Sequence, residues 1–253
     1  MSLLLEVRDV SKHFGGLQAL NQAYLTVPKG AIVGLIGPNG AGKTTFFNVM
    51  TGLYQPDSGS FILNGQAYNP IAVDEVLRAG IARTFQNIRL FKEMSVLENV
   101  MVGRHSRTSS GLFSTIFKTY ANRLEERQIV EDATRLLAYV GIEKEAFQIS
   151  KNLSYGAQRR LEIARALATD PVLLALDEPA AGMNQTEKIE LQQLLEKIRA
   201  DGKTILMIEH DVRLVMGICD EITVLDEGKV IAQGIPEDVR RNPLVIEAYL
   251  GRS

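Results

Sequence analysis

Short apolar segments that end in turn residues recur along the chain and predict β-strands. They are LLLEV at 3–7, AIVGLIG at 31–37, FIL at 61–63, VLLAL at 172–176, TILMI at 204–208, EITVL at 221–225 and KVIAQ at 229–233. Three of them, 31–36, 172–176 and 204–208, are almost wholly apolar, which is typical of parallel strands buried on both faces. The pattern therefore predicts buried parallel strands at the centre of the fold.

Between these segments, apolar residues recur every three to four positions and predict amphipathic helices. One helix is expected over 186–200 and another over 124–140. Strands that alternate with helices indicate a parallel α/β core. The region 87–165 differs, because its pattern is nearly all helical, and we interpret it as a helical insertion. The expected organisation is one domain, with an α/β core formed by 1–86 and 166–253 around a helical subdomain of 87–165.

Composition limits the possible classes of protein. The chain has 253 residues, 45% of them hydrophobic and 23% charged, with a formal net charge of −2. The near-neutral charge gives no support for nucleic-acid binding. The single cysteine, Cys219, excludes a disulfide within the chain and suits a reducing cytosol. The start MSLLLEVRDV argues against a signal peptide, and the apolar runs fall short of the roughly 18 residues of a membrane span.

The segment GPNGAGKT, Gly37 to Thr44, follows the strand at 31–36 and precedes an expected helix at 43–53. This spacing and context match a P-loop, in which backbone N–H groups wrap a phosphate chain. Lys43 would reach the β- and γ-phosphates, and the Thr44 hydroxyl would bind Mg²⁺. A chance glycine-rich turn would need neither residue. We predict nucleotide contacts from Gly37, Pro38, Asn39, Gly40, Ala41, Gly42, Lys43, Thr44 and Thr45.

Polar residues follow three other expected strands. The strand in VLLALDEP ends at Asp177, at the sheet edge where open α/β folds bind ligands. Asp177 is predicted to hold the metal shell and Glu178 to polarise a water, although Asp-Glu-Pro alone could be a helix cap or a turn. Gln86 follows IARTF, and His210 follows TILMIE. Each could be a satisfied strand-end residue, but in a nucleotide site Gln86 would contact the metal and the attacking water, and His210 the γ-phosphate.

The segment NLSYGAQRRLEIARAL, 152–167, predicts a second anion site. Its apolar residues recur at helical spacing after Gly156. The Ser-Tyr-Gly turn before that helix presents a hydroxyl and free backbone N–H groups. One chain thus carries two phosphate-binding patterns.

A basic and aromatic segment, HSRTSSGLFSTIFKTYANR, precedes this helix. From Gly103 to Gln128 there are five Lys or Arg against two Glu, interleaved with Phe113, Phe117 and Tyr120. We interpret it as a flexible surface loop whose aromatic residues pack locally. The alternative is a contact with a membrane-embedded partner.

Six motifs that span essentially the whole chain occur in the order found in ABC transporter ATPases. They resemble that family's adenine-stacking aromatic, Walker A, Q-loop, signature, Walker B and switch histidine, and are Phe14, GPNGAGKT, Gln86, LSYGAQ, LALDEP and His210. In this family two nucleotide-binding domains pair head to tail. The resemblance therefore implies that Ser154, Tyr155 and Gly156 contact the ATP of the partner chain, which would explain the second phosphate pattern.

The resemblance also implies roles for the other site residues and shows where the chain departs from the family. Catalytic roles fall to Glu178, His210 and Gln86, and metal binding to Thr44, Gln86 and Asp177. The usual signature reads LSGGQ, whereas Tyr155 and Ala157 stand here in place of a Gly and a Gln. The segment AAGM at 180–183 stands where many relatives have SALD. We expect the site to work, with the Tyr155 ring pointing away from the phosphates.

Several segments resemble one branch of the family, the G-type ATP-binding subunit of Liv-type, high-affinity branched-chain amino acid importers. They are NLSYGAQRRLEIARAL, DEPAAGMNQTE, EHDVRLVMGICD and the ending RRNPLVIEAYLGRS. This resemblance implies a P-loop (RecA-like) α/β ATPase core with an N-terminal antiparallel β part and an inserted helical subdomain. It implies ATP and Mg²⁺ as ligands and uptake of branched-chain or other neutral amino acids as the function.

The same resemblance implies partners. They are a second ATPase subunit, two transmembrane permease subunits and, indirectly, an extracytoplasmic substrate-binding protein, with no nucleic acid. The two ATPase subunits would form a heterodimer, with a homodimer as the alternative for the isolated chain. The permeases would hold the chain peripherally at the cytoplasmic face of the cell membrane. Alternatives that keep the ATPase role are import of urea or short amides and export of lipopolysaccharide, because the cargo is chosen by other subunits.

Other classes fit less well. A P-loop GTPase would carry an Asn-Lys-x-Asp motif, which is absent. A soluble ABC-type repair or translation ATPase would usually need two cassettes or a DNA-facing arm. A module that binds ATP without hydrolysis would lack the carboxylate of Glu178.

Overall fold

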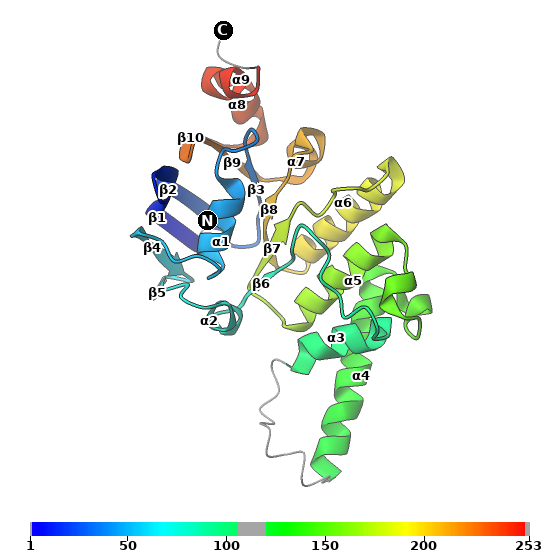
Figure 1. Cartoon of the computed structure of the whole chain (residues 1–253). Helices are drawn as coiled ribbons and strands as arrows, with labels where there is room; N and C mark the ends of the chain where they lie inside the picture. The colour runs from blue at the N-terminus through cyan, green and yellow to red at the C-terminus, as the bar shows by residue number, and fades with distance from the viewer. Residues whose placement is uncertain (1, 106–119, 251–253) are drawn as a thin grey trace. The chain divides into compact units, whose positions relative to one another are not determined.

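The computed structural model describes residues 2–105 and 120–250, which form two compact units. One, here called the α/β unit, comprises Met1–Arg83 and Val172–Ser253, and the other, the helical unit, comprises Thr84–Pro171. Figure 1 shows the elements of each unit. Residues 106–119, which hold most of the basic and aromatic segment, lie outside the described residues, so neither interpretation of that loop is tested.

The α/β unit contains two sheets. The antiparallel sheet has the order β2-β1-β4-β5, with the strands β1 (Leu3–Phe14), β2 (Leu17–Pro28), β4 (Ser58–Leu63) and β5 (Gln66–Tyr68). The larger sheet has the order β10-β9-β3-β8-β7-β6, with the strands β3 (Ile32–Ile36), β6 (Ile81–Arg83), β7 (Leu173–Asp177), β8 (Thr204–Ile208), β9 (Glu221–Asp226) and β10 (Lys229–Gly234). All its pairings are parallel except the one between β10 and β9.

Helix α1 (Lys43–Met50) packs between the two sheets, as Figure 1 shows. Its Phe46, Phe47 and Met50 belong to one buried cluster with residues from both sheets. Because side chains alternate along a strand, Val33 and Leu35 of β3 face this cluster. Helix α2 (Val73–Arg78) precedes β6. The position of the P-loop at the start of α1 is therefore set by the core itself.

The opposite face of β3 is covered by α7 (Val212–Ile218). A Cβ on Gly34 would lie 2.8 Å from Val215, so the helix approaches the strand at the distance that only glycine allows. Helix α6 (Gln185–Ala200) contacts β8 and buries its apolar face, and it begins with a capping box between Asn184 and Glu187. Helices α8 (Pro236–Arg241) and α9 (Pro243–Leu250) end the described chain.

The helical unit is built from α3 (Val96–His105), α4 (Tyr120–Val140) and α5 (Tyr155–Ala168), with short 3-10 turns at Glu143–Glu145 and Ser150–Asn152. Helices α3 and α5 come unusually close, because a Cβ on Gly103 would lie 2.4 Å from the carbonyl oxygen of Arg165. Buried Ala133, Leu137 and Leu161 fill the interior.

The expected fold class is confirmed: an antiparallel N-terminal sheet, a parallel α/β core and a helical insertion are present. Some expected bounds were wrong. The first strand runs to Phe14 instead of ending at residue 7, and the helix expected over 43–53 ends at Met50, where Thr51 caps it.

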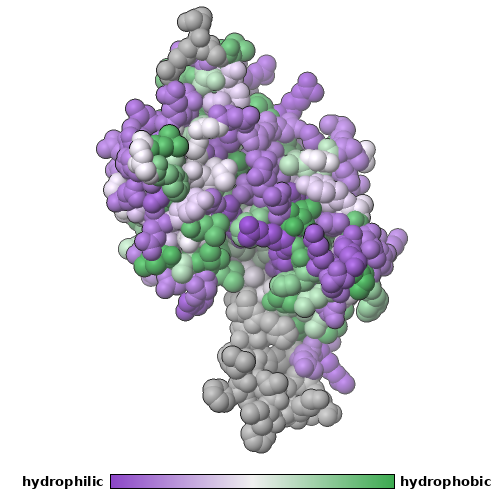
Figure 2. Space-filling view, viewed as in Figure 1, coloured by the Kyte–Doolittle hydropathy of each residue, from purple (hydrophilic) through white to green (hydrophobic). Residues whose placement is uncertain are grey.

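On the face seen in Figure 2, hydrophobic residues form separate small areas among hydrophilic ones. Within residues 2–105 and 120–250, no helix has the length and apolar character that a membrane crossing requires.

Candidate nucleotide-binding site

The segment Gly37–Thr44 joins β3 to α1 as a tight glycine-dependent loop. Gly37 and Gly42 have φ angles of 153° and 99°, and a Cβ on Gly37 would lie 2.0 Å from the carbonyl oxygen of Leu225. Larger residues cannot take this path. Helix α1 has no side-chain cap at its N-terminus and no acidic residue in its first turn. Its first N–H groups therefore remain available to an anion.

The side chain of Lys43 is hydrogen-bonded to the backbone of the P-loop. Its buried ammonium donates to the carbonyl oxygens of Gly37 at 2.7 Å and Pro38 at 2.9 Å. Burial lowers the pKa of Lys43, and the carboxylate of Glu178 acts in the opposite direction. Phosphate oxygens would replace these carbonyls as charged acceptors and would strengthen the hydrogen bonds.

The other side of the P-loop borders a cavity of about 400 Å³. The cavity is lined by Pro38–Ala41 of the loop and also by Asp226, Glu227 and Glu247. Three carboxylates disfavour phosphate there, so the N-terminus of α1 is the better phosphate site.

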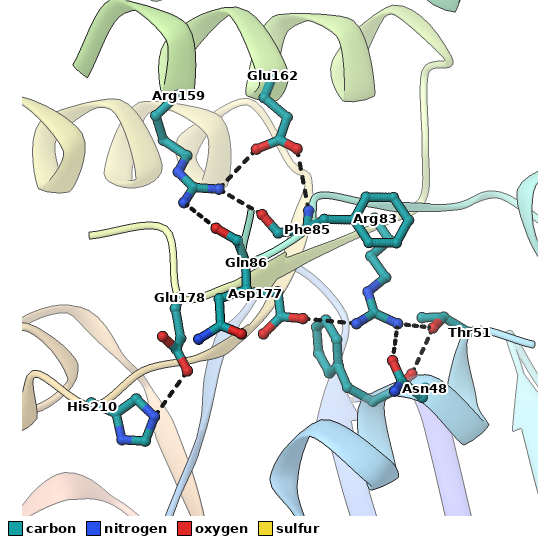
Figure 3. A network of polar contacts seen from close by, with 11 residues as sticks. Asn48, Thr51, Arg83, Phe85, Gln86, Arg159, Glu162, Asp177, Glu178 and His210 are labelled. Atoms are coloured by element: carbon teal, nitrogen blue, oxygen red, sulfur yellow. Dashed lines mark hydrogen bonds and ion pairs between the residues drawn. The ribbon is translucent and has the colours of Figure 1, made fainter. Parts of the chain in front are cut away.

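Asp177 ends β7 and is held by Arg83, the last residue of β6. Nη2 of Arg83 lies 2.7 Å from Oδ2 of Asp177, and both side chains are more than nine-tenths buried. The other guanidinium nitrogen donates to Asn48 at 2.8 Å and Thr51 at 2.6 Å, both from α1 or its cap, as Figure 3 shows. The guanidinium also lies over the Phe47 ring. Arg83 thus links the carboxylate predicted to bind metal to the helix that follows the P-loop.

Glu178 occupies a strained turn directly after β7. Its φ angle is 47°, a left-handed conformation that is uncommon for residues other than glycine. Its Oε1 lies 2.9 Å from Nε2 of His210, and its backbone N–H donates to Ile208 at 2.9 Å. Strained residues cluster at functional sites, where the surrounding structure holds them.

The buried carboxylate of Glu209 connects the two turns that carry Glu178 and His210. One oxygen accepts from the backbone N–H of Ala180 at 2.7 Å, and the other from the N–H groups of His210 at 3.1 Å and Asp211 at 3.4 Å. Burial raises the pKa of Glu209, while these N–H groups lower it. Glu209 therefore holds the two turns in the positions that bring Glu178 and His210 into contact.

Phe14 lies at the end of β1 with its side chain partly exposed. Its ring packs edge-on against Tyr54, with centroids 5.2 Å apart, and the Lys12 ammonium lies 5.5 Å from its centroid. At 43% exposure the ring can receive another flat group. This is the arrangement that base stacking requires.

The helical unit carries Gln86 and the segment Ser154–Gly156. Ser154 is the N-cap of α5 and accepts from the N–H of Ala157 at 3.3 Å. Ser154 and Tyr155 are exposed, and Gly156 is buried. Gln86 is also exposed, and the carbonyl of its peptide accepts from Arg159 at 2.9 Å. The start of α5 is thus an exposed helix N-terminus whose cap, Ser154, occupies one N–H group of the first turn.

Comparisons with known proteins identify the family. Residues 20–181 match the family described as "ABC transporter". The chain belongs to the ABC transporter ATPases. Residues 229–253 also match the family described as "Branched-chain amino acid ATP-binding cassette transporter".

Two relatives of this ABC ATPase match it along its length. The high-affinity branched-chain amino acid transport ATP-binding protein LivG of Escherichia coli K12 is 46% identical over 99% of this chain and 98% of its own. The corresponding protein BraF of Pseudomonas aeruginosa is 46% identical over the same shares.

Solved structures support the same assignment. A nucleotide-free ATP-binding cassette from an ABC transporter superposes with a TM-score of 0.86, at 32% identity over 99% of this chain and all of that one. A dimeric cassette bound to ADP and Pi has a TM-score of 0.77, at 25% identity over 92% of this chain and 98% of that one. Cassettes of this family therefore occur as dimers. The match of residues 20–181 to the ABC transporter family excludes the alternative of a P-loop GTPase.

The α/β unit of the ABC ATPase contains most of the site residues expected from the sequence. Of these, Asp177, Glu178, His210 and the P-loop are connected by the contacts above, whereas Phe14 shares only the unit, and Gln86 and Ser154–Gly156 belong to the helical unit. Three charged residues next to them were missed by sequence reasoning: Arg83, Glu209 and Arg159. A signal was available at Glu209, a carboxylate directly after an apolar strand and before His210.

Proposed function

We propose that this chain hydrolyses ATP to power import of branched-chain amino acids through a membrane-embedded permease pair. The geometry that supports hydrolysis best is the 2.9 Å contact between Glu178 and His210. Glu178 also lies near enough to the P-loop for its charge to raise the pKa of Lys43. A carboxylate held this way can accept a proton from water, and a histidine can contact the γ-phosphate. The full-length likeness to LivG supports the cargo.

Mg²⁺ fits the residues present. Thr44 is exposed at the start of α1, and Asp177 ends β7 in the same unit, so both offer the oxygen ligands that Mg²⁺ prefers. Among the described residues no cluster of three or more His, Cys, Asp or Glu could hold a metal alone. This fits Mg²⁺, which usually binds through one or two protein ligands together with phosphates and waters. When bound, it would neutralise charge on the β- and γ-phosphates, with Gln86 as a further ligand.

The proposed working complex contains a second ATPase subunit, two permeases and an extracytoplasmic binding protein that delivers cargo. The chain would sit at the cytoplasmic face of the membrane through the permeases. Ser154, Tyr155 and Gly156 would contact the nucleotide of the second ATPase subunit. The N-terminus of α5 supports this role, because the exposed Ser154 hydroxyl and the N–H groups of a helix N-terminus suit a γ-phosphate.

The cargo is tested by reconstitution. The chain, its partner ATPase and its permeases are placed in proteoliposomes, and ATP-dependent uptake of leucine, isoleucine and valine is measured with the matching binding protein. We expect ATP-dependent uptake by the wild-type complex and loss of that uptake in Glu178→Gln. Uptake of urea instead, or outward movement of lipopolysaccharide, would contradict the proposed cargo.

The two-chain site is tested at Ser154. Ser154→Asp keeps an N-cap residue but places a negative charge where a partner's phosphate would lie, and Ser154→Asn is the matched neutral control. ATP affinity of the isolated chain should be unchanged in both variants. Hydrolysis by the assembled complex should fall in Ser154→Asp well below Ser154→Asn. A loss of affinity in the isolated chain would mean that the segment acts on its own nucleotide.

A further inference from the structure

Helix α5 contains a buried ion pair one turn after the signature segment. Nη1 of Arg159 lies 2.8 Å from Oε2 of Glu162, and the two side chains are 0% and 2% exposed. Buried charges lose their hydration, and an ion pair restores this loss only when further hydrogen bonds satisfy both groups. The other hydrogen-bond partners of Arg159 and Glu162 therefore show which part of the chain the ion pair positions.

Those partners are the main chain on both sides of Gln86. Arg159 donates to the carbonyl oxygens of Phe85 at 2.7 Å and Gln86 at 2.9 Å. Glu162 accepts from the N–H groups of Phe85 at 3.3 Å and Arg89 at 3.4 Å. Figure 3 shows the guanidinium and the carboxylate aimed at the Phe85–Gln86 backbone. Two carbonyls and two amides of one loop are thus fixed by one turn of α5.

Tyr155 connects the same pair to the signature segment. Its hydroxyl lies 3.3 Å from Nη2 of Arg159, and the guanidinium lies 5.9 Å from its ring centroid. The two residues are four positions apart on α5 and so share one helix face. Tyr155, which replaces the usual glycine of the family, therefore extends toward Arg159. A small residue at this position could make neither contact.

We propose that Arg159 is a positioning residue that lets the segment Ser154–Gly156 set the place of Gln86. A helix moves as a rigid element, so a displacement of the start of α5 carries Arg159 and the Phe85–Gln86 carbonyls with it. Contact of the segment with a partner's nucleotide is then transmitted to the residue proposed to complete the metal site. This inference rests on the proposed action of the segment on a second chain.

The main test is a double-mutant cycle in the assembled, cargo-stimulated complex. Arg159→Lys keeps the charge opposite Glu162 but loses the planar fork that reaches two carbonyls. It should lower kcat about two- to a hundredfold, the range of coupling within one hydrogen-bond network, while ATP affinity of the isolated chain stays unchanged. In a Gln86→Ala background the same substitution should have little further effect. Equal losses in both backgrounds would overturn the proposal, because Arg159 would then act only through general stability.

Two further measurements do not depend on hydrolysis. In the isolated chain, the side-chain amide NMR signal of Gln86, assigned with Gln86→Ala, should shift in Arg159→Lys and more weakly in Tyr155→Phe. Glu143→Gln, at an exposed position of the same unit, is the matched control and should leave the signal in place. An unchanged Gln86 signal in Arg159→Lys would reject the positioning role even where the transporter proves inactive. Absence of ATP hydrolysis by the assembled wild-type complex would instead reject the proposed function.

Discussion

Oε1 of Glu178 and Nε2 of His210 lie 2.9 Å apart, and they follow the neighbouring parallel strands β7 and β8. Because both strands end at the same sheet edge, the contact is built into the core. Glu209 fixes the turns on either side through backbone N–H groups.

Glu178→Gln should separate binding from chemistry. The amide keeps the shape but cannot accept a proton, and loss of a general base lowers rates by about 10²–10⁴. ATP should still bind, and turnover of the assembled complex should fall by that factor. Turnover close to wild type would exclude Glu178 as the base. His210→Ala should also slow turnover and spare binding.

Lys43→Ala should remove most ATP affinity. The ammonium lies within the P-loop curve, and a hydrogen bond to a charged group contributes about 1.5–3 kcal/mol, so the dissociation constant should rise roughly tenfold to a hundredfold or more. Titration with a fluorescent ATP analogue measures it. Lys29→Ala, at an exposed position of the same unit, should bind as wild type does. Unchanged affinity in Lys43→Ala would refute the phosphate site.

Phe14→Ala should weaken ATP binding with little change in base preference. Stacking of an aromatic ring on a base contributes about 1–3 kcal/mol, and the partly exposed ring is braced by Tyr54. Phe14→Tyr should retain most of the affinity. Leu17→Ala, at the start of β2 and 67% exposed, is the control. If Phe14→Ala and Leu17→Ala bind ATP equally well, Phe14 is not the base platform.

Arg83→Met should destabilise the α/β unit. Removing one partner of a buried ion pair lowers the free energy of unfolding by about 3–5 kcal/mol, because Asp177 is left buried without the guanidinium. Urea denaturation measures this. Arg78→Met removes an exposed pair with Asp74 and should change stability by less than about 1 kcal/mol. The double variant Arg83→Met, Asp177→Asn should lose less free energy of unfolding than the sum of the two single variants. Fully additive losses would show that the two side chains do not interact.

Asp211 should contribute stability that depends on pH. Hydrogen bonding from Lys188 and from the first N–H groups of α7 lowers the pKa of Asp211 below its ordinary value of 3.8. A lowered folded-state pKa stabilises the fold above the unfolded pKa and loses this effect as pH falls through the folded value. Asp211→Asn keeps the N-cap, so the difference from wild type should be about 0.5–1 kcal/mol near pH 7 and should shrink below about pH 4. A difference independent of pH would show that the charge contributes nothing.

The sequence was most informative where local pattern decides structure. The P-loop was recognisable because its glycines, strand and helix are contiguous. The sequence pattern predicted too short a first strand and did not predict β2, and the reason is also local. Asp9 and Gln22 have φ angles of 51° and 50°, and the β1–β2 register shifts around them. Such bulges break the period-two alternation by which strands are recognised.

The missed site residues depend on contacts that are distant in sequence. Arg83 meets Asp177 across 94 positions, and Arg159 meets Gln86 across 73. A charged residue in an expected strand or helix has no visible partner in the sequence, so its role emerges only when the sheet and α5 are assembled. The three-residue spacing of Arg159 and Glu162 places both on one helix face, but spacing alone does not show which groups the pair contacts.

The parallel pairing of β6 with β7 has a consequence for synthesis of the chain. Ile81 pairs with Leu173, so the whole of 84–171 must be translated before β6 finds its neighbour. At about 5–20 residues per second, β6 waits roughly 4–18 s on the ribosome. Strand β3 waits longer, because both its partners, β8 and β9, come later still. The contacts of the helical unit are complete by Pro171, so the inserted unit can fold before the sheet that flanks it in sequence.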